Sequence, residues 1–144
     1  MKVQPYLFFG GRCEEAIAFY TSAVGAELTM LLRFKDNPEP PGPDVVPAGL
    51  DDKIMHASFV IGDTEVMASD GCGATIEEFK GVSLSIAVGS EAEAARVFRA
   101  LSEGGSVQMP LGRTFFSPAF GMLADRFGVS WMVVTVPEES AAAA

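Results

Sequence analysis

The sequence predicts an α+β fold made of two β-α-β-β-β modules, each a mixed, curved sheet with one helix on one face. Three observations indicate this fold: an internal repeat, two segments with helical spacing of apolar residues, and eight strand-like segments against two helical ones. The third observation excludes a doubly wound α/β fold, because strands and helices would then alternate throughout the chain.

The internal repeat carries most weight, because self-similarity at a fixed offset reflects a repeated structural unit. Five positions of the first half recur at a constant offset of 78 residues: Gly11–Gly89, Glu15–Glu93, Ala16–Ala94, Phe19–Val97 and Tyr20–Phe98. One inserted residue then aligns Gly25 with Gly104, and strand, helix, strand and hairpin follow in the same order in both halves.

In the first half, apolar residues at i, i+3, i+4 and i+7 predict a helix over residues 12–24, which Gly25 ends. Gly62 and Asp63 are a turn signal between the two strands of a hairpin. The four strands are expected at residues 3–9, 26–33, 54–61 and 64–69.

In the second half, Ser90 and Glu93 match the S-x-x-E capping box, in which each side chain accepts an unpaired N–H at the helix start. Gly104 and Gly105 end this helix. Its apolar face consists of Ala94, Val97, Phe98 and Leu101. The four strands are expected at residues 82–88, 106–109, about 114–124 and 129–136.

We expect one domain over residues 1–137, with module one at 1–70 and module two at 81–136. Residues 34–53 contain five prolines and two glycines, so they should form neither a helix nor a central strand. This segment is expected to be a mobile loop, either functional or simply a disordered insertion. Residues 138–144 are expected to be a frayed tail.

The composition excludes several classes of partner. The net charge is -9 with no compensating basic cluster, so nucleic acid and anionic membrane surfaces are poor partners. No apolar stretch approaches the roughly 18 residues of a membrane span, and the N-terminus lacks a signal-peptide core. The two cysteines lie far apart in sequence, which favours reduced thiols and a cytoplasmic protein.

Three blocks in order along residues 4–131 resemble a known family: QPYLFFGGRCEEAIAFY, IMHASFVIGDTEVMASD and FGMLADRFGVSW. They are similar to the PhnB-like branch of the vicinal oxygen chelate superfamily, also called the glyoxalase/bleomycin-resistance/dioxygenase fold. Many members carry a 3-demethylubiquinone methyltransferase label, although the sequence contains no G-x-G-x-x-G cofactor motif. The resemblance implies a homodimer with cavities between paired modules.

Enzymes of the superfamily place metal ligands on the first and last strands of each module. The resemblance puts these positions at Gln4, at Val66 or Met67, near Ser83, and at Met132. A register error of one residue would turn the opposite side chain inward, so Glu65 is the alternative on the hairpin strand. Thioethers and neutral hydroxyls are poor ligands for hard divalent ions, so we predict no bound metal and no cofactor.

Several residues are candidates for binding a small molecule. If Gln4 faces a cleft, Tyr6 and Phe8 share its side of the strand, although ordinary core packing is the alternative. His56, the sole histidine, is either a general acid or base or a hydrogen-bonded structural residue. The predicted ligand-binding set is Gln4, Tyr6, Phe8, His56, Met67, Ser83, Arg113 and Phe116.

Three functions stay open on this basis. The first is a protein that binds a small apolar or aromatic molecule in a dimer cleft without metal. The second is a metal-dependent lyase, isomerase or dioxygenase of the glyoxalase superfamily. The third is a metal-free enzyme that uses His56, for which a Cys13–His56 dyad is conceivable, although Cys13 opens an apolar helix face and is expected to be inert.

Overall fold

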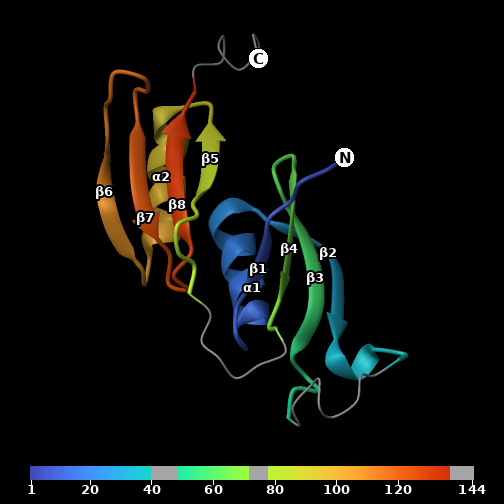
Figure 1. Ribbon diagram of the computed structural model, residues 1–144. Coiled ribbons are helices and arrows are strands. Elements are labelled where there is room, and N and C mark those ends of the chain that lie inside the picture. Colours follow the sequence, from blue (N-terminus) through green and yellow to red (C-terminus); the bar gives the residue numbers. More distant parts are fainter. Residues whose placement is uncertain (40–48, 72–77, 137–144) are drawn as a thin grey trace. The chain divides into compact units, whose positions relative to one another are not determined.

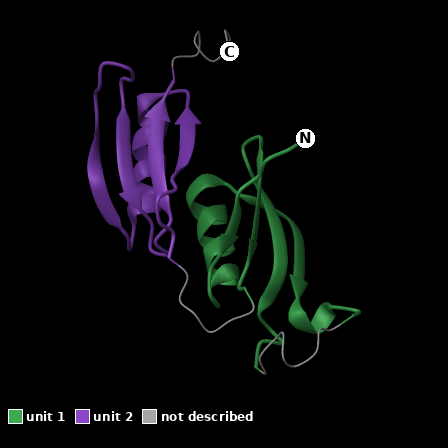
Figure 2. Ribbon diagram, viewed as in Figure 1, with its two compact units in different colours: residues 1–77 green, residues 78–144 purple. Residues whose placement is uncertain are grey.

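The computed structural model describes residues 1–39, 49–71 and 78–136. The chain divides into two compact units, Met1–Glu77 and Glu78–Ala144 (Figure 2). Within the described residues, each unit has one α-helix and one four-stranded mixed sheet (Figure 1). The predicted α+β class with two β-α-β-β-β modules is therefore confirmed.

The first unit follows the predicted order of elements. It contains β1 (Tyr6–Phe8), α1 (Cys13–Val24), β2 (Glu27–Arg33), β3 (Ile54–Ile61) and β4 (Thr64–Ser69). The strand order is β1-β4-β3-β2, with β1 parallel to β4 and the other neighbours antiparallel.

The second unit repeats this arrangement. It contains β5 (Leu84–Val88), α2 (Glu91–Ser102), β6 (Ser106–Gly112), β7 (Phe120–Ala124) and β8 (Ser130–Thr135). The strand order is β5-β8-β7-β6, again with one parallel pair, between β5 and β8.

In each unit the helix covers one face of the sheet. Tyr20 of α1 is fully buried and stacks on Phe59 of β3, with ring centroids 6.0 Å apart. In the second unit a Cβ on Gly121 of β7 would lie 2.6 Å from the Phe98 ring of α2, so only glycine fits there. We call the opposite side of each sheet its open face.

The repeat extends to details of the sheets. An irregularity in pairing falls between Leu28 and Met30 in β2, and another between Val107 and Met109 in β6. These positions are 79 residues apart, whereas the helices are 78 apart, because the turn after α2 has one residue more than the turn after α1. The two sheets can therefore be compared residue by residue.

Two expectations need correction. Residues 34–53 were expected to contain no helix, but Phe34–Asp36 form a 3-10 turn, and Phe34 N and Lys35 N donate to Lys53 O and Asp51 O. This pairing at the loop base lies outside the proline-rich centre and so meets no proline restriction. Of the loop expected to be mobile, 34–53, residues 40–48 lie outside the described residues, as does the tail 138–144.

The second correction concerns the strand expected over about 114–124, which begins only at Phe120. Thr114 N donates to Ser117 O at 2.9 Å and Ser117 N donates to the Thr114 hydroxyl at 3.1 Å, so the chain turns here, and Pro118 follows. The buried Ser117 hydroxyl lies 2.7 Å from Thr135 O and fixes this turn against β8. Among the described residues, no helix is long and apolar enough to cross a membrane.

Candidate functional site

The open face of the first sheet carries a row of side chains that crosses all four strands. Tyr6 of β1 pairs with Met67 of β4, Met67 with Ser58 of β3, and Ser58 with Met30 of β2. Paired residues point to the same face, so the row lies on the side away from α1. Phe8 lies on the same face of β1, with its ring centroid 5.0 Å from that of Tyr6.

A short hydrogen-bonded chain runs across this row. The Tyr6 hydroxyl lies 2.9 Å from His56 Nδ1, and the Ser58 hydroxyl lies 3.4 Å from His56 Nε2. His56 is half-buried, and its ring centroid is 5.5 Å from that of Tyr6. Both imidazole nitrogens therefore have partners on the open face.

A charged pair lies at the N-terminal end of β4. The parallel pairing of β1 and β4 continues through a hydrogen bond of 3.0 Å from Met67 N to Pro5 O, which sets Gln4 beside Glu65. The neighbouring Gln4 amide, followed by Lys2 and Ser58, holds the pKa of the Glu65 carboxyl below its ordinary value of 4.5. Lys2 Nζ is 3.5 Å from Glu65 Oε2.

The structure corrects the predicted position of the ligand on the hairpin strand. Val66 is 3% exposed and faces α1, so it is excluded. Met67 faces the open side but lies opposite Tyr6, and the residue beside Gln4 is Glu65. The register of the parallel pair gives this result, which the sequence alone left open.

The structure places five predicted site residues on one face of the first unit and the other three in the second unit. Gln4, Tyr6, Phe8, His56 and Met67 share the open face of the first sheet. Ser83, Arg113 and Phe116 belong to the second unit. Sequence reasoning missed Ser58, although its spacing of two from His56 was a signal that both side chains face the same way.

Ser83 is the counterpart of Gln4. Ser85 pairs with Met132 as Tyr6 pairs with Met67, so Ser83 and Gln4 each lie two residues before the paired position. Within the described residues, Gln4 Nε2 and Ser83 Oγ are the buried side-chain atoms without a partner in hydrogen-bond geometry. The same register makes Ser130, rather than Met132, the residue opposite Ser83.

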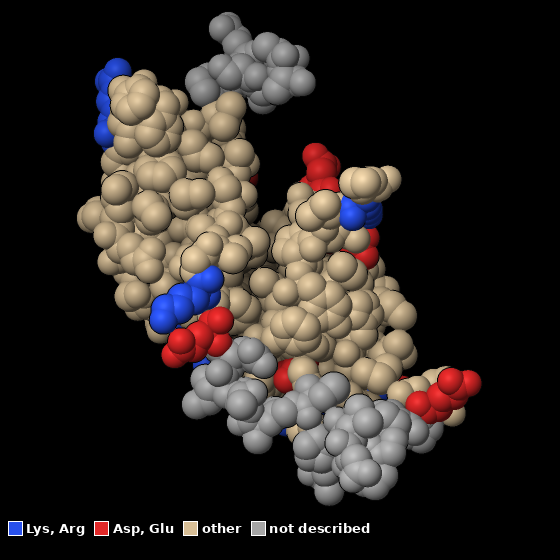
Figure 3. All heavy atoms as spheres, viewed as in Figure 1, with Lys and Arg blue, Asp and Glu red and all other residues tan. Residues whose placement is uncertain are grey.

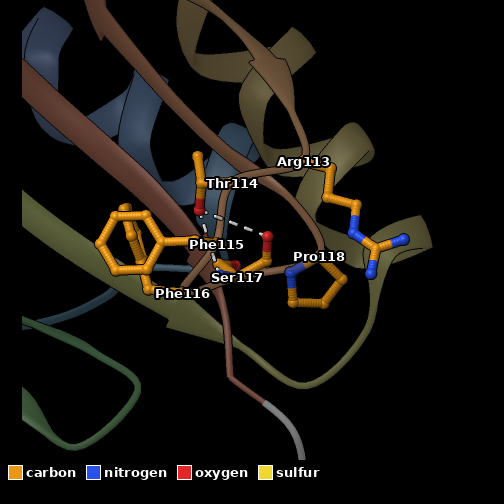
Figure 4. A pocket seen from close by; sticks show the side chains of 6 residues that line it. All are labelled: Arg113, Thr114, Phe115, Phe116, Ser117 and Pro118. Carbon is orange, nitrogen blue, oxygen red and sulfur yellow. Dashed lines mark hydrogen bonds between the residues drawn. The ribbon is translucent and has the colours of Figure 1, made fainter.

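Arg113 and Phe116 line a shallow pocket of about 220 Å³ formed by residues 113–118 (Figure 4). Figure 4 shows the Arg113 side chain extending away from the Phe115 and Phe116 rings. Phe116 packs edge-on against Phe120, with centroids 5.1 Å apart, at the start of β7. The two predicted residues are therefore neighbours, but the cation and the ring do not converge on one point.

A Cys13–His56 dyad is excluded. Cys13 has no exposed surface and lies on the buried side of α1, whereas His56 lies on the open face of the sheet. Burial raises the pKa of the Cys13 thiol from 9.0 to about 12, with Asp70 and Glu14 adding to the effect. The thiol is therefore protonated and unreactive in the folded protein.

Comparison with known proteins gives a consistent family. The family model described as 3-demethylubiquinone-9 3-methyltransferase matches residues 1–134. Protein YjdN of Escherichia coli (strain K12) is 32% identical over 144 residues, covering 96% of this chain and 98% of YjdN.

Solved structures agree with this result. Protein PA1353 from Pseudomonas aeruginosa is 49% identical with a TM-score of 0.83, covering 96% of this chain and 99% of that one. A PhnB protein from Bacillus cereus is 33% identical with a TM-score of 0.76, covering 94% and 100%. The fosfomycin resistance protein FosX from Listeria monocytogenes, at 12% identity, a TM-score of 0.62 and 97% coverage of each chain, shares the fold alone.

Proposed function

We propose a function for this chain, which belongs to the family described as 3-demethylubiquinone-9 3-methyltransferase. It is a PhnB- and YjdN-like protein with the glyoxalase fold of the vicinal oxygen chelate superfamily. Its proposed role is to bind a small apolar or aromatic molecule, without metal, on the open face of the first sheet. The proposed setting is a cleft of a cytoplasmic homodimer.

The observation that supports this proposal is the composition of that open face. It combines exposed apolar side chains, with Phe8 44% and Met30 46% exposed, and one localised polar chain through Tyr6, His56 and Ser58. Small-molecule sites are mostly apolar surfaces with a few placed polar groups. Methionine adapts its shape to apolar ligands and contacts aromatic rings favourably.

The metal that the superfamily implies does not fit these residues. Gln4 and Glu65 would supply two oxygen donors, but the ammonium of Lys2 already pairs with the Glu65 carboxylate. The corresponding residues of the second unit, Ser83 and Ser130, offer neutral hydroxyls, which are weak ligands. Throughout residues 1–39, 49–71 and 78–136, no group of three His, Cys, Asp or Glu could hold an ion.

A metal-dependent lyase, isomerase or dioxygenase is the second candidate, because Gln4 and Glu65 do lie side by side. Metal analysis of protein purified without chelator separates the two candidates. Less than about one-tenth of an equivalent of Zn, Ni, Mn or Fe is expected. Stoichiometric metal that is lost in Glu65→Gln would move the assignment to the second candidate.

The binding proposal is tested by titrating the ¹⁵N-labelled protein with indole and following amide shifts. Shifts are expected in β1, β3 and β4. Met67→Lys, which places a charge in the middle of the first row, should abolish them. Met132→Lys, at the matching position of the second sheet, is the control and should leave them intact. Shifts confined to the second unit, or none at all, would refute the proposal.

The proposed homodimer is supported by apolar surface that the described chain leaves exposed. In Figure 1, β7 and β8 lie in front of α2, and Figure 3 shows few charged side chains over this open face. Met109, Phe115 and Phe116 are 45%, 100% and 54% exposed. Large exposed apolar patches are unusual on monomers. Light scattering should give twice the chain mass of 15.2 kDa.

A further inference from the structure

Three methionines lie next to one another across the open face of the second sheet. Met132 of β8 pairs with Met122 of β7, and Met122 pairs with Met109 of β6. These three strands are consecutive neighbours in the sheet (Figure 1). Because paired residues point to the same face, the three side chains form one uninterrupted row, which we call the methionine row.

The methionine row lies on the face away from α2. Trp131, next to Met132, is 3% exposed, and Leu123, next to Met122, is fully buried. Since successive side chains of a strand point to opposite faces, Met122 and Met132 face the open side. Both are half-buried there and Met109 is 45% exposed, so the row is accessible to a small ion.

The spacing of the row suits an ion held between two sulfur atoms. Residues directly opposite each other on neighbouring strands have Cβ atoms about 4.5–5.5 Å apart. The sulfur bonds of first-row metals such as zinc are about 2.3 Å long, so two sulfurs on either side of one ion lie about 4.6 Å apart. The flexible methionine side chain adjusts to this separation without a shift of the backbone. Met122, in the middle, can share an ion with either neighbour.

The chemistry of the row determines which ion fits. Thioethers are soft, uncharged donors that select Cu(I), whereas hard divalent ions prefer carboxylates, carbonyls and water. A cation is also favoured by the net charge of -9. We propose that the methionine row binds one soft monovalent ion, Cu(I), through Sδ of Met122 and of at least one of its two neighbours.

This site is separate from the binding function proposed for the first sheet and uses none of its residues. On the first sheet the corresponding row is interrupted. Where the second sheet has Met132, Met122 and Met109, the first has Met67, Ser58 and Met30, so a serine separates its two methionines. The chain therefore contains its own control for a continuous row of thioethers.

The proposal is tested with Ag(I), a redox-inert ion with the charge and softness of Cu(I), on the full chain labelled with ¹³C at the methionine methyl groups. A Cys72→Ser background removes a competing thiol, and Cys13 is buried and protonated. One equivalent of Ag(I) should shift the methyl signals of Met122 and of Met109, Met132 or both. The signals of Met30 and Met67 should stay in place.

Two matched variants measure the affinity, and Leu is chosen because it conserves the volume of Met. Met122→Leu should weaken Ag(I) binding at least about tenfold, since even residues that only surround metal ligands change affinity by that much. Met67→Leu, at an isolated methionine of the first sheet, should leave the affinity unchanged. Competition with a coloured Cu(I) chelator under reducing conditions should give the same order of variants.

The outcomes are distinct from those of the first proposal. Shifts confined to Met30 and Met67, no shift at one equivalent, or equal affinities of Met122→Leu and the wild type would each overturn the ion site. Indole binding should be the same in Met122→Leu as in the wild type, so loss of the ion site leaves the binding function of the first sheet standing.

Discussion

The two helices occupy the same position in the two units, but α2 is capped by a residue next to it in sequence and α1 by a residue far from it. Ser90 caps α2 locally, with its hydroxyl accepting from Glu93 N at 3.1 Å. The N-cap of α1 is Arg12, whose side chain makes no capping bond. Instead, Asp70 at the end of β4 accepts from Gly11 N and Cys13 N, both at 2.8 Å.

This difference shows how one repeated fold can solve the same problem locally or at long range. Asp70 also accepts from Ile54 N at 2.8 Å, so one buried carboxylate joins the start of α1, the start of β3 and the end of β4. It satisfies free N–H groups at the helix N-terminus, where negative charge is favourable. The stability of the first unit therefore depends on the single side chain of Asp70, whereas the second unit caps its helix locally with Ser90.

The largest expected effect comes from removing that residue. Asp70→Ala leaves three N–H groups unpaired, two of them buried, and should lower the free energy of unfolding by about 3–5 kcal/mol. Hydrogen exchange should rise most in the first unit. The matched control is Asp125→Ala in the second unit, measured by the same denaturant titration.

Asp125 is also buried and accepts from Phe127 N, Val129 N and Trp131 Nε1. All three donors lie within six residues of it, so they stabilise one local turn. We expect Asp125→Ala to cost less, about 1–3 kcal/mol. Equal losses of unfolding free energy in the two variants would show that the long-range cap stabilises the protein no more than the local turn does.

A second contrast lies at the first helical position, which is Cys13 in α1 and the exposed Glu91 in α2. The folded-state pKa of Cys13, about 12, lies above the ordinary 9.0, so folding favours the protonated thiol. The stabilisation is complete below pH 9 and is lost as pH rises toward 12, because only the unfolded chain then releases the proton.

Relative to Cys13→Ala, the wild type should therefore lose about 2–3 kcal/mol of stability between pH 8 and pH 11. Urea titrations of both proteins at each pH measure this difference. A stability difference that does not change with pH would contradict the buried thiol. In a Cys72→Ser background, Cys13 should react with a thiol reagent only after unfolding.

The two open faces differ more than the helices do, and exchanging their residues tests this. Tyr6→Ser gives the first sheet the residue of the second and should weaken indole binding about tenfold, from loss of the ring contact and one hydrogen bond. Ser85→Tyr should change binding less than about twofold, since Met122 and Phe120 give its hydroxyl no polar partner. Amide-shift titration measures both, and a gain of binding in Ser85→Tyr would show that the ring alone suffices.

The fold was predictable because its signals are local and repeated. Helical spacing, the glycine stops and the offset of 78 residues gave both modules, and residues 54–61 and 64–69 matched β3 and β4 to the residue. The Ser90 cap was predictable for the same reason. The Asp70 cap was not, because its partners lie 57 and 59 residues away in sequence.

The candidate site was predictable only in part, because it depends on register between strands. Alternation placed Tyr6 and Phe8 on one face, but which β4 residue lies beside Gln4 follows only from the pairing of β1 with β4. The sequence therefore left Glu65 as an alternative and missed Ser58. Arg113 and Phe116 were expected on a strand and lie on a turn, because the Thr114–Ser117 hydrogen bond competes with strand pairing.

The smallest expected effect returns to the helix starts. Ser90→Ala removes a single local cap and should cost about 1 kcal/mol. Ser90→Asp should restore most of this, because a carboxylate accepts the same N–H and also favours the helix N-terminus. Arg12→Ala, at the corresponding position of α1, should cost less than about 0.5 kcal/mol, since its ion pair with Glu15 is exposed and Asp70 still caps the helix. Denaturant titrations of the three variants check the order; a larger loss from Arg12→Ala than from Ser90→Ala would mean that α1 depends on its own N-cap after all.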